Sequence, residues 1–345
     1  MIFQPFNDLS IYEHVAHLYA MRVMKHPMAL AVYQLGTVNE PGVSDLDMLV
    51  VVKSDCTDIN DMSAKNILKD EPQLLAVFLH DVAVFDMQGF KDLPYIYYLS
   101  RLQHLAGEEI PIELKQNQLS SEVHLANLIE FSLPRVHRLG QFQQKKISPR
   151  KMVLLALAYI HTVTLAEKIG IVSQENVKFI NRAIALRKEV KTGVSEEHIL
   201  KFCNDARIMF AKSLNAAANT LPVQKEAPRI AILCDYNRRA ITLFGNCSEN
   251  KDLCGNTPFG IPDTTWLLAS EGLYWYFHCY AKMNGLLGDS AKRALTPSCK
   301  ENGLADDFRS FLEDRSIKLN RRVIFLRKVK GEYSDIMPRP GFMIR

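Results

Sequence analysis

Residues 35–52 read LGTVNEPGVSDLDMLVVV, and this stretch decides the fold of the first part of the chain. A polar turn containing Gly36 separates two apolar segments, which predicts two strands joined by the turn. Successive side chains of a strand point to opposite faces, so Asp45 and Asp47 share one face. A buried core does not require two adjacent acids, whereas Mg²⁺ commonly joins protein carboxylates to substrate phosphates. The pair therefore predicts half of a metal site.

The turn before the two acids suits a phosphate group. Gly36 carries no side chain, so backbone N–H groups can approach a phosphate closely, with the Thr37 hydroxyl beside them. Neither Gly-Lys-Ser nor Gly-Lys-Thr follows the turn, which excludes a Walker-type phosphate loop. The sequence thus predicts a phosphate-binding turn beside a metal site.

The order of these residues resembles the signature of the DNA polymerase β-like nucleotidyltransferase superfamily. A Gly-Thr pair is followed by seven residues and then by Asp-Leu-Asp and a hydrophobic strand. The resemblance ends near residue 110. It implies that Gly36, Thr37 and Ser44 bind the nucleotide and that Asp45 and Asp47 bind two divalent metals. Thr37 stands where Ser is commoner in the superfamily and keeps the hydroxyl.

The resemblance also implies a third carboxylate on a neighbouring strand. Residues 77–86 are rich in β-branched and aromatic side chains and predict that strand. Asp81 interrupts the apolar run and Asp86 closes it. An acid among apolar strand residues is costly unless it is paired or metal-bound, which favours Asp81, with Asp86 as the alternative. Residues 102–111 resemble the short strand and Leu-x-Gly-Glu turn that follow the third acid in bacterial members.

Composition sets limits on the rest of the chain. The length of 345 residues predicts two or three units. The hydrophobic fraction of 48% is ample for a buried core. The net charge of +4 is small for this length and does not indicate a nucleic-acid or membrane-surface protein. Residues 1–8 do not form a targeting signal, and the chain lacks an apolar run long enough to span a bilayer, so a cytoplasmic location is expected.

The seven cysteines are an odd number without a C-x-x-C pair. This pattern favours free thiols in a reducing compartment. Cys247 and Cys254 are the closest two in the sequence, and a disulfide or metal clip between them is the alternative.

The fold class expected is α+β. We expect a nucleotidyltransferase domain with a small mixed sheet over residues 1–115, a mostly helical domain over 116–225, and a smaller α+β region of unassigned role over 226–345. The predicted helices cover residues 8–25, 58–69, 123–131, 149–169, 172–190, 196–221 and 264–287, with strands at 230–233 and 321–330. The resemblance implies that the helical domain closes the cleft and contributes to substrate choice.

A basic cluster runs from Arg135 to Lys151, broken by several glutamines. It has two interpretations. Lysine and arginine neutralise phosphate charge, so the cluster suits a triphosphate or a nucleic-acid acceptor. The alternative is a solvated loop between two helices.

These observations predict a metal-dependent nucleotidyltransferase. The enzyme would move an NMP from an NTP, with ATP expected, to an acceptor hydroxyl and release pyrophosphate. Asp45, Asp47 and Asp81 would hold Mg²⁺ or Mn²⁺. The low net charge favours a small molecule or a protein side chain over RNA as acceptor. The alternative is a nucleotide-sensing or interaction module without turnover; base preference, acceptor and oligomeric state stay open.

Overall fold

The structure is a computed structural model, and it describes residues 6–112, 119–140, 148–171, 173–225, 230–235, 240–244, 255–256, 264–269, 271–282, 295–296 and 303–330. These residues form two compact units. The described part of the first unit comprises residues 6–112, 119, 185–194 and 321–330, and the second unit contains the rest. The predicted boundary at residues 115 and 116 lies in a segment outside the described residues.

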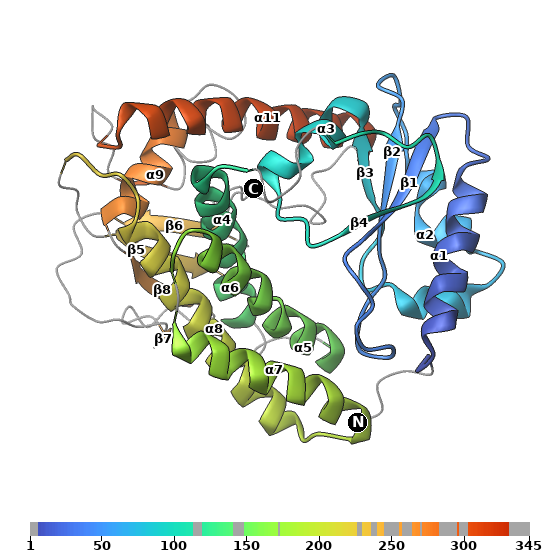
Figure 1. Ribbon diagram of the computed structural model, residues 1–345, viewed down its shortest axis with the longest axis horizontal. Coiled ribbons are helices and arrows are strands. Elements are labelled where there is room, and N and C mark those ends of the chain that lie inside the picture. Colours follow the sequence, from blue (N-terminus) through green and yellow to red (C-terminus); the bar gives the residue numbers. More distant parts are fainter. Residues whose placement is uncertain are drawn as a thin grey trace. The chain divides into compact units, whose positions relative to one another are not determined.

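The first unit contains a four-stranded mixed sheet (Figure 1). Its strands are β1 (Ala29–Leu35), β2 (Asp47–Val52), β3 (Ala83–Asp86) and β4 (Leu102–Gly107), in the order β3-β2-β1-β4. Strand β1 is antiparallel to both β2 and β4, and β2 is parallel to β3. The prediction of a small mixed sheet is confirmed, and so are the two strands on either side of the glycine turn.

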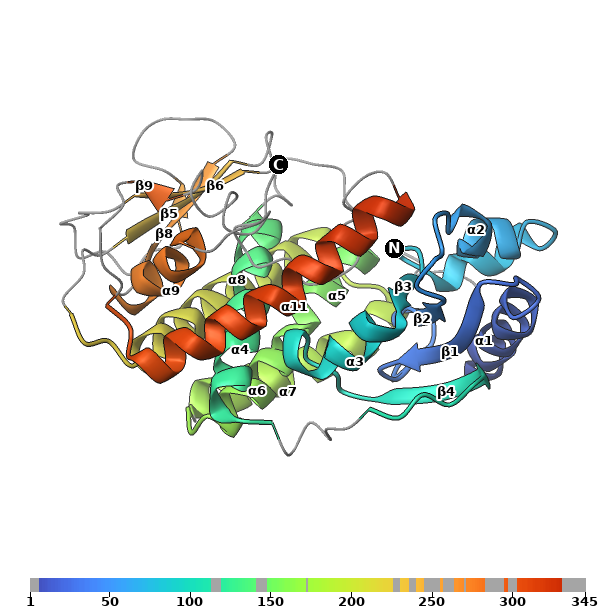
Figure 2. The ribbon, with the colours of Figure 1, turned by 90° about the horizontal axis from the view of Figure 1, so that it is seen from above.

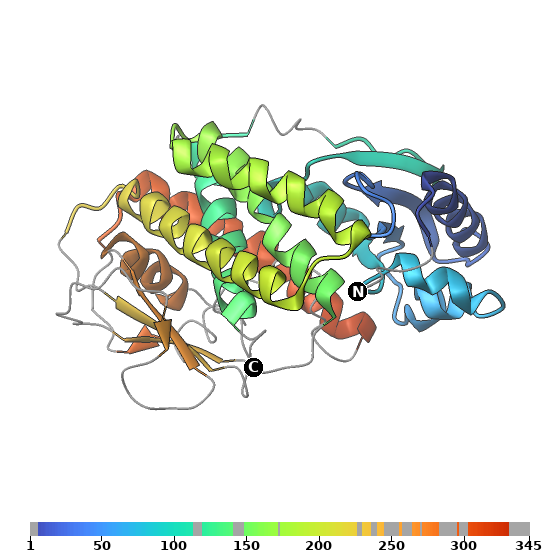
Figure 3. The same cartoon turned by 90° about the horizontal axis from the view of Figure 1, so that it is seen from below.

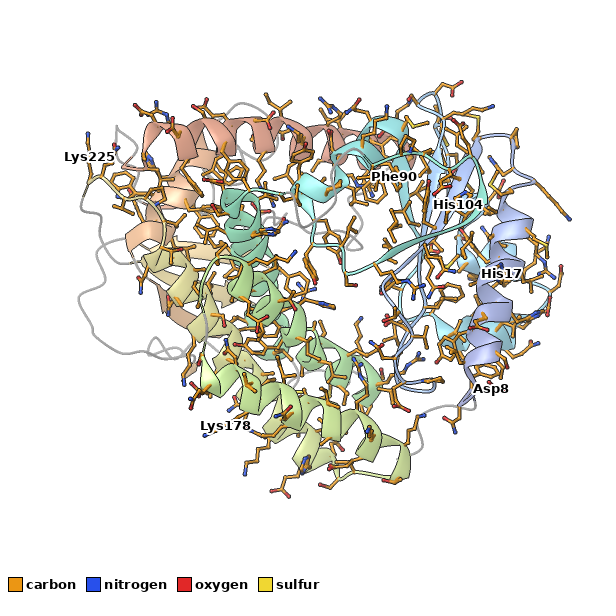
Figure 4. The ribbon with its side chains drawn as sticks, viewed as in Figure 1. Asp8, His17, Phe90, His104, Lys178 and Lys225 are labelled. Atoms are coloured by element: carbon orange, nitrogen blue, oxygen red, sulfur yellow. The ribbon has the colours of Figure 1, made fainter. Side chains whose placement is uncertain are left out.

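Five helical segments accompany this sheet: α1 (Leu9–Val23), η1 (Asn60–Met62), α2 (Ala64–Ile67), η2 (Pro72–Val77) and α3 (Met87–Ile96). Helix α1 begins at Asp8, whose side chain accepts a hydrogen bond from the Ser10 N–H (Figure 4). The helix predicted at residues 8–25 is confirmed. The single helix predicted over 58–69 is instead two short segments, because Ser63 interrupts it as the N-cap of α2.

The strand predicted over residues 77–86 is wrong in its first half. Only the last four of these residues form a strand, β3, and the preceding ones form the end of η2 and a loop. Apolar side chains misled the prediction: Val77 is fully buried and Phe78 packs against the same core, although neither belongs to a strand. Asp81 consequently lies in a loop before β3 and not within the sheet.

Each face of the first sheet has its own core. One face packs against α1 and the short helical segments, with side chains such as Val15, Val50 and Met62. On the other face, the ring of Tyr33 stacks on Phe90 from α3, with ring centroids 4.8 Å apart (Figure 4). The rings of Tyr33 and of His104 from β4 (His104 is labelled in Figure 4) meet in an edge arrangement, with centroids 5.2 Å apart.

The first core also contains the end of helix α11 (Asp306–Lys330). The strand predicted at residues 321–330 is therefore wrong. Phe325, Leu326 and Val329 are buried at helical spacing, and the basic residues between them misleadingly suggested an alternating strand. Arg322 lies 3.6 Å above the Phe85 ring and donates to the Val84 carbonyl oxygen.

The second unit contains a helical bundle (Figure 3). Its helices are α4 (Ser121–Gly140), α5 (Pro149–Leu157), α6 (Tyr159–Lys168), the first part of α7 (Gln174–Thr192) and α8 (Glu196–Asn219). The Ser195 hydroxyl caps α8 by accepting from the His198 N–H, and α6 and α7 end before Gly170 and Gly193, both at positive φ. The helix predicted at 149–169 is split at Ala158.

A second sheet of five strands follows the bundle in sequence. The strands are β5 (Ile230–Asp235), β6 (Ala240–Phe244), β7 (Gly255–Asn256), β8 (Thr264–Ala269) and β9 (Leu295–Thr296), in the order β7-β8-β5-β6-β9. Helix α9 (Glu271–Lys282) contacts β5 (Figure 2). The helix predicted at 264–287 is thus wrong in its first part, which is β8. Cys247, Cys254 and residues 141–147 of the basic cluster lie outside the described residues.

The interior of the second unit holds an ion pair. Glu130 of α4 and Arg315 of α11 are each 1% exposed, with Arg315 Nη2 2.7 Å from Glu130 Oε2. The hydroxyls of Tyr276 and Tyr280 both donate to Glu130 Oε1, at 2.6 and 3.0 Å. Arg315 also donates to Asn127 Oδ1. No helix in the described ranges has both the length and the apolar character needed to cross a membrane.

Candidate metal centre

The two predicted acids lie together at the start of β2. Leu46 and Met48 are each 1% exposed, while the side chains of Asp45 and Asp47 are 20% and 38% exposed. The Leu46 N–H donates to the Val77 carbonyl oxygen at 2.9 Å and so fixes the backbone between the acids. The two carboxylates lie close together, although only Asp47 belongs to β2 and Asp45 precedes the strand.

A histidine completes the group. One ligand atom each from Asp45, Asp47 and His80 lies within 4.8 Å of the others, and such a group could hold a metal ion. His80 Nε2 lies 2.7 Å from Asp47 Oδ1 and 3.7 Å from Asp45 Oδ2. His80 comes from the loop between η2 and β3, which the parallel pairing of β2 with β3 brings beside the start of β2.

The second ring nitrogen of His80 sets its tautomer. His80 Nδ1 lies 2.9 Å from the Asp81 carbonyl oxygen, which can only accept a hydrogen bond, so Nδ1 carries a hydrogen. In the neutral ring the lone pair is then on Nε2 and points at the two carboxylates. Metal-binding histidines are commonly held this way, with the far N–H on a carbonyl.

The charges around His80 favour its protonated form. Desolvation opposes the imidazolium, but the hydrogen bond to Asp47 and the negative charges of Asp47 and Asp45 outweigh it and raise the pKa of His80 to about 9. Without a metal ion, the imidazolium therefore neutralises part of the charge of the acid pair at neutral pH. A metal cation in the group would take over that role.

Neither candidate for the third carboxylate belongs to this group. Asp81 Oδ1 accepts hydrogen bonds from the backbone N–H groups of Ala64 and Val82, at 2.9 and 2.8 Å, and so holds the start of α2. Asp86 is the N-cap of α3 and accepts from the Gly89 N–H at 2.7 Å. Both carboxylates have structural partners where they lie, and the third position beside the acid pair belongs to His80.

The glycine turn has the backbone conformation that its sequence suggests. Gly36 has a φ of 63°, where a side chain is unfavourable, and its own N–H donates to the Arg101 carbonyl oxygen at 2.9 Å. That N–H is thus used within the fold. The Thr37 hydroxyl is exposed and donates to Asn39 Oδ1 at 3.0 Å. Ser44 is buried, and its hydroxyl accepts from the Glu40 N–H at 3.0 Å, so it shapes the turn.

The hydroxyl of Tyr12 in α1 holds the turn through two hydrogen bonds. It accepts from the Gly42 N–H at 3.0 Å and donates to the Ser44 carbonyl oxygen at 3.1 Å. Neither Tyr12 nor His80 is among the site residues predicted from the sequence. The helical spacing of α1 marks Tyr12 only as a core residue, while the position of His80 next to Asp81 was the available signal for a second ligand candidate.

Comparisons of the chain with models of known protein families, with curated proteins and with solved structures find no match. The resemblance to nucleotidyltransferases therefore depends on the residues of the glycine turn and of the start of β2.

Proposed function

We propose that the protein is a metal-dependent nucleotidyltransferase that transfers an NMP from an NTP, with ATP the expected nucleotide, to an acceptor hydroxyl. One observation carries the proposal: Asp45, Asp47 and His80 converge directly after a glycine turn, at the start of a strand in a small mixed sheet. Two neighbouring carboxylates with a histidine from the loop before β3 are costly for a core and are suited to a cation that also binds phosphates.

In this proposal each residue has a defined part. Asp45, Asp47 and His80 would hold the divalent metal, Mg²⁺ or Mn²⁺, which would supply charge neutralisation at the phosphates and activation of the acceptor. The turn at Gly36 and Thr37 receives the phosphates. The acceptor oxygen forms a bond to the α-phosphorus while the bond to the β-phosphate oxygen breaks, so pyrophosphate leaves and the acceptor proton passes to solvent or base.

The test is pyrophosphate release and label transfer from each α-labelled NTP, with Mg²⁺ or Mn²⁺ and a cell extract as the acceptor pool. Asp45→Asn and Asp47→Asn are expected to lose both signals. Asp55→Asn is the matched control, because Asp55 is exposed in the loop after β2. Wild-type activity in Asp45→Asn and Asp47→Asn, as in the control, would contradict the proposal. Label transfer without added metal would contradict it as well. The labelled product also shows whether the acceptor is a small molecule, a protein or RNA.

A second function is favoured by a specific observation. Asp81 and Asp86 are both held by backbone N–H groups, so the group beside the turn has two carboxylates and a histidine. A site with fewer acids fits a nucleotide-sensing module that binds an NTP with metal and does not turn it over. Binding of an NTP by the wild type without pyrophosphate release from any NTP would favour this function.

A further inference from the structure

The last two turns of α7 place two cations beside the glycine turn. Lys191 forms an ion pair with Glu40, which lies in the turn. Arg187 is one helical turn earlier, so the two side chains lie on the same face of the helix. Leu186 and Val190 of this segment are buried, and the segment belongs to the first unit.

The guanidinium of Arg187 lies among the charges of the candidate site. Burial lowers its pKa, and the negative charges of Glu40 and Asp45 offset part of that effect. Its Nε is buried and lacks a hydrogen-bond partner in the part of the chain that the structure describes. A buried N–H without a partner is unfavourable, and a guanidinium offers a planar set of donors that matches a phosphate. The unpartnered Nε–H of Arg187 and the nearby acids indicate a ligand with oxygen atoms that accept hydrogen bonds.

We propose that Arg187 binds a non-transferred phosphate, β or γ, of the nucleotide received by the glycine turn. The inference rests on the proposed function and names one more residue that touches the substrate. The ion pair of Lys191 with Glu40 joins the helix to the turn, so that Arg187, one helical turn away, is held near it. The negative charge of Asp45 acts on Arg187 in the protein without ligand, and a metal bound to Asp45 would compensate that carboxylate and leave the guanidinium for the phosphate.

The test compares the full chain with Arg187→Gln and Arg187→Lys. Lys188→Gln is the matched control, because Lys188 is the exposed neighbour on the same helix. Affinities for ATP, ADP and AMP are measured with Mn²⁺ by displacement of a fluorescent nucleotide. Arg187→Gln is expected to weaken ATP binding by about ten- to a hundredfold and to leave AMP nearly unchanged. Arg187→Lys is expected to fall between, and Lys188→Gln to match the wild type.

Two results would overturn the inference. If Arg187→Gln weakens the binding of ATP and of AMP equally and lowers the melting temperature, Arg187 has a packing role. If the affinity for ATP is unchanged, Arg187 has no role in binding. If Arg187→Gln does not fold, Arg187→Lys decides, and an unchanged ratio of ATP to AMP affinity contradicts the proposal. The proposed function fails separately: a wild type that binds no ATP overturns both, whereas a wild type that releases pyrophosphate beside an unaffected Arg187→Gln overturns only this inference.

Discussion

The charged clusters of the two units differ in burial and in the partners of their carboxylates. In the second unit Glu130 has Arg315 and two tyrosine hydroxyls as partners and is almost fully buried. Burial lowers the pKa of Arg315, but Glu130 outweighs burial and the net shift is upward. In the first unit Asp45 and Asp47 share one histidine and are partly exposed. Glu130 is satisfied by the chain itself, whereas the acid pair is compensated by a ring that can give up its proton.

This difference separates a structural charge from a ligand site. A buried ion pair with several hydrogen bonds makes its partners indispensable to the fold, since removing one leaves an uncompensated charge. Replacing one of two partly exposed acids is expected to change the free energy of unfolding little. Cation binding is the property that such a replacement should change most. Mutations in the two clusters should therefore affect different measurements, and four predictions test this, from the largest expected effect to the smallest.

The largest effect is expected on stability in the second unit. Arg315→Met leaves Glu130 buried without its cation, so the free energy of unfolding should fall by about 3–5 kcal/mol. Asp47→Asn in the first unit should change it far less, because its carboxylate is 38% exposed and repelled by Asp45. Urea denaturation of both variants in EDTA measures this. Similar losses of unfolding free energy in the two variants would contradict the difference between the two clusters.

The next effect is on metal binding. His80→Ala removes a nitrogen ligand and should weaken Mn²⁺ binding by about 10–100-fold, as changes at metal sites commonly do. Imidazole suits transition metals better than Mg²⁺, so the wild type is expected to prefer Mn²⁺ over Mg²⁺, and His80→Asp to reduce that preference. Titration calorimetry with each metal checks both points. Wild-type preference for Mg²⁺ would argue against His80 as a ligand.

A smaller effect is expected at the base of the glycine turn. Tyr12→Phe removes the hydroxyl that joins the Gly42 N–H to the Ser44 carbonyl oxygen. The free energy of unfolding should fall by about 1–3 kcal/mol, since a buried N–H loses its partner. The affinity for ATP should fall with it, as the turn loosens. Unchanged stability and unchanged ATP affinity of Tyr12→Phe would refute a role of this hydroxyl.

The smallest effect follows from the raised pKa of His80. A group whose pKa is raised in the folded state, here from 6.5 to about 9, stabilises the fold fully below its unfolded pKa and loses that contribution as the pH rises through the folded value. In EDTA, wild type should be more stable than His80→Gln near pH 6, and the difference should shrink as the pH rises and vanish above about pH 9. A constant difference across this range would rule out the charge of His80 as its source.

Much of the first unit could be predicted from local pattern. The glycine turn, the two strands beside it and the closeness of Asp45 and Asp47 follow from period-two alternation and turn chemistry, which are properties of neighbouring residues. The third ligand could not be predicted this way. The prediction assumed a strand around Asp81, and in the actual loop that side chain turns to the Ala64 N–H while His80 meets the acids.

The misassigned segments share a physical cause. Residues 321–330 and 264–269 carry apolar side chains whose spacing fits more than one period over a short window, so tertiary contacts decide between helix and strand. The position of Arg187 beside Glu40 and Asp45 depends on α7 contributing its last turns to the first unit, a long-range arrangement that local pattern does not contain.

The packing of residues 321–330 in the first core has a consequence for biosynthesis. The strands and α1 leave the ribosome early, but Phe325, Leu326 and Val329, which fill their core, are translated last among the described residues. Domains usually fold in order as they emerge. The earlier segment therefore keeps part of its apolar surface exposed, and the growing chain is expected to need chaperone protection until residues 325–329 have left the ribosome.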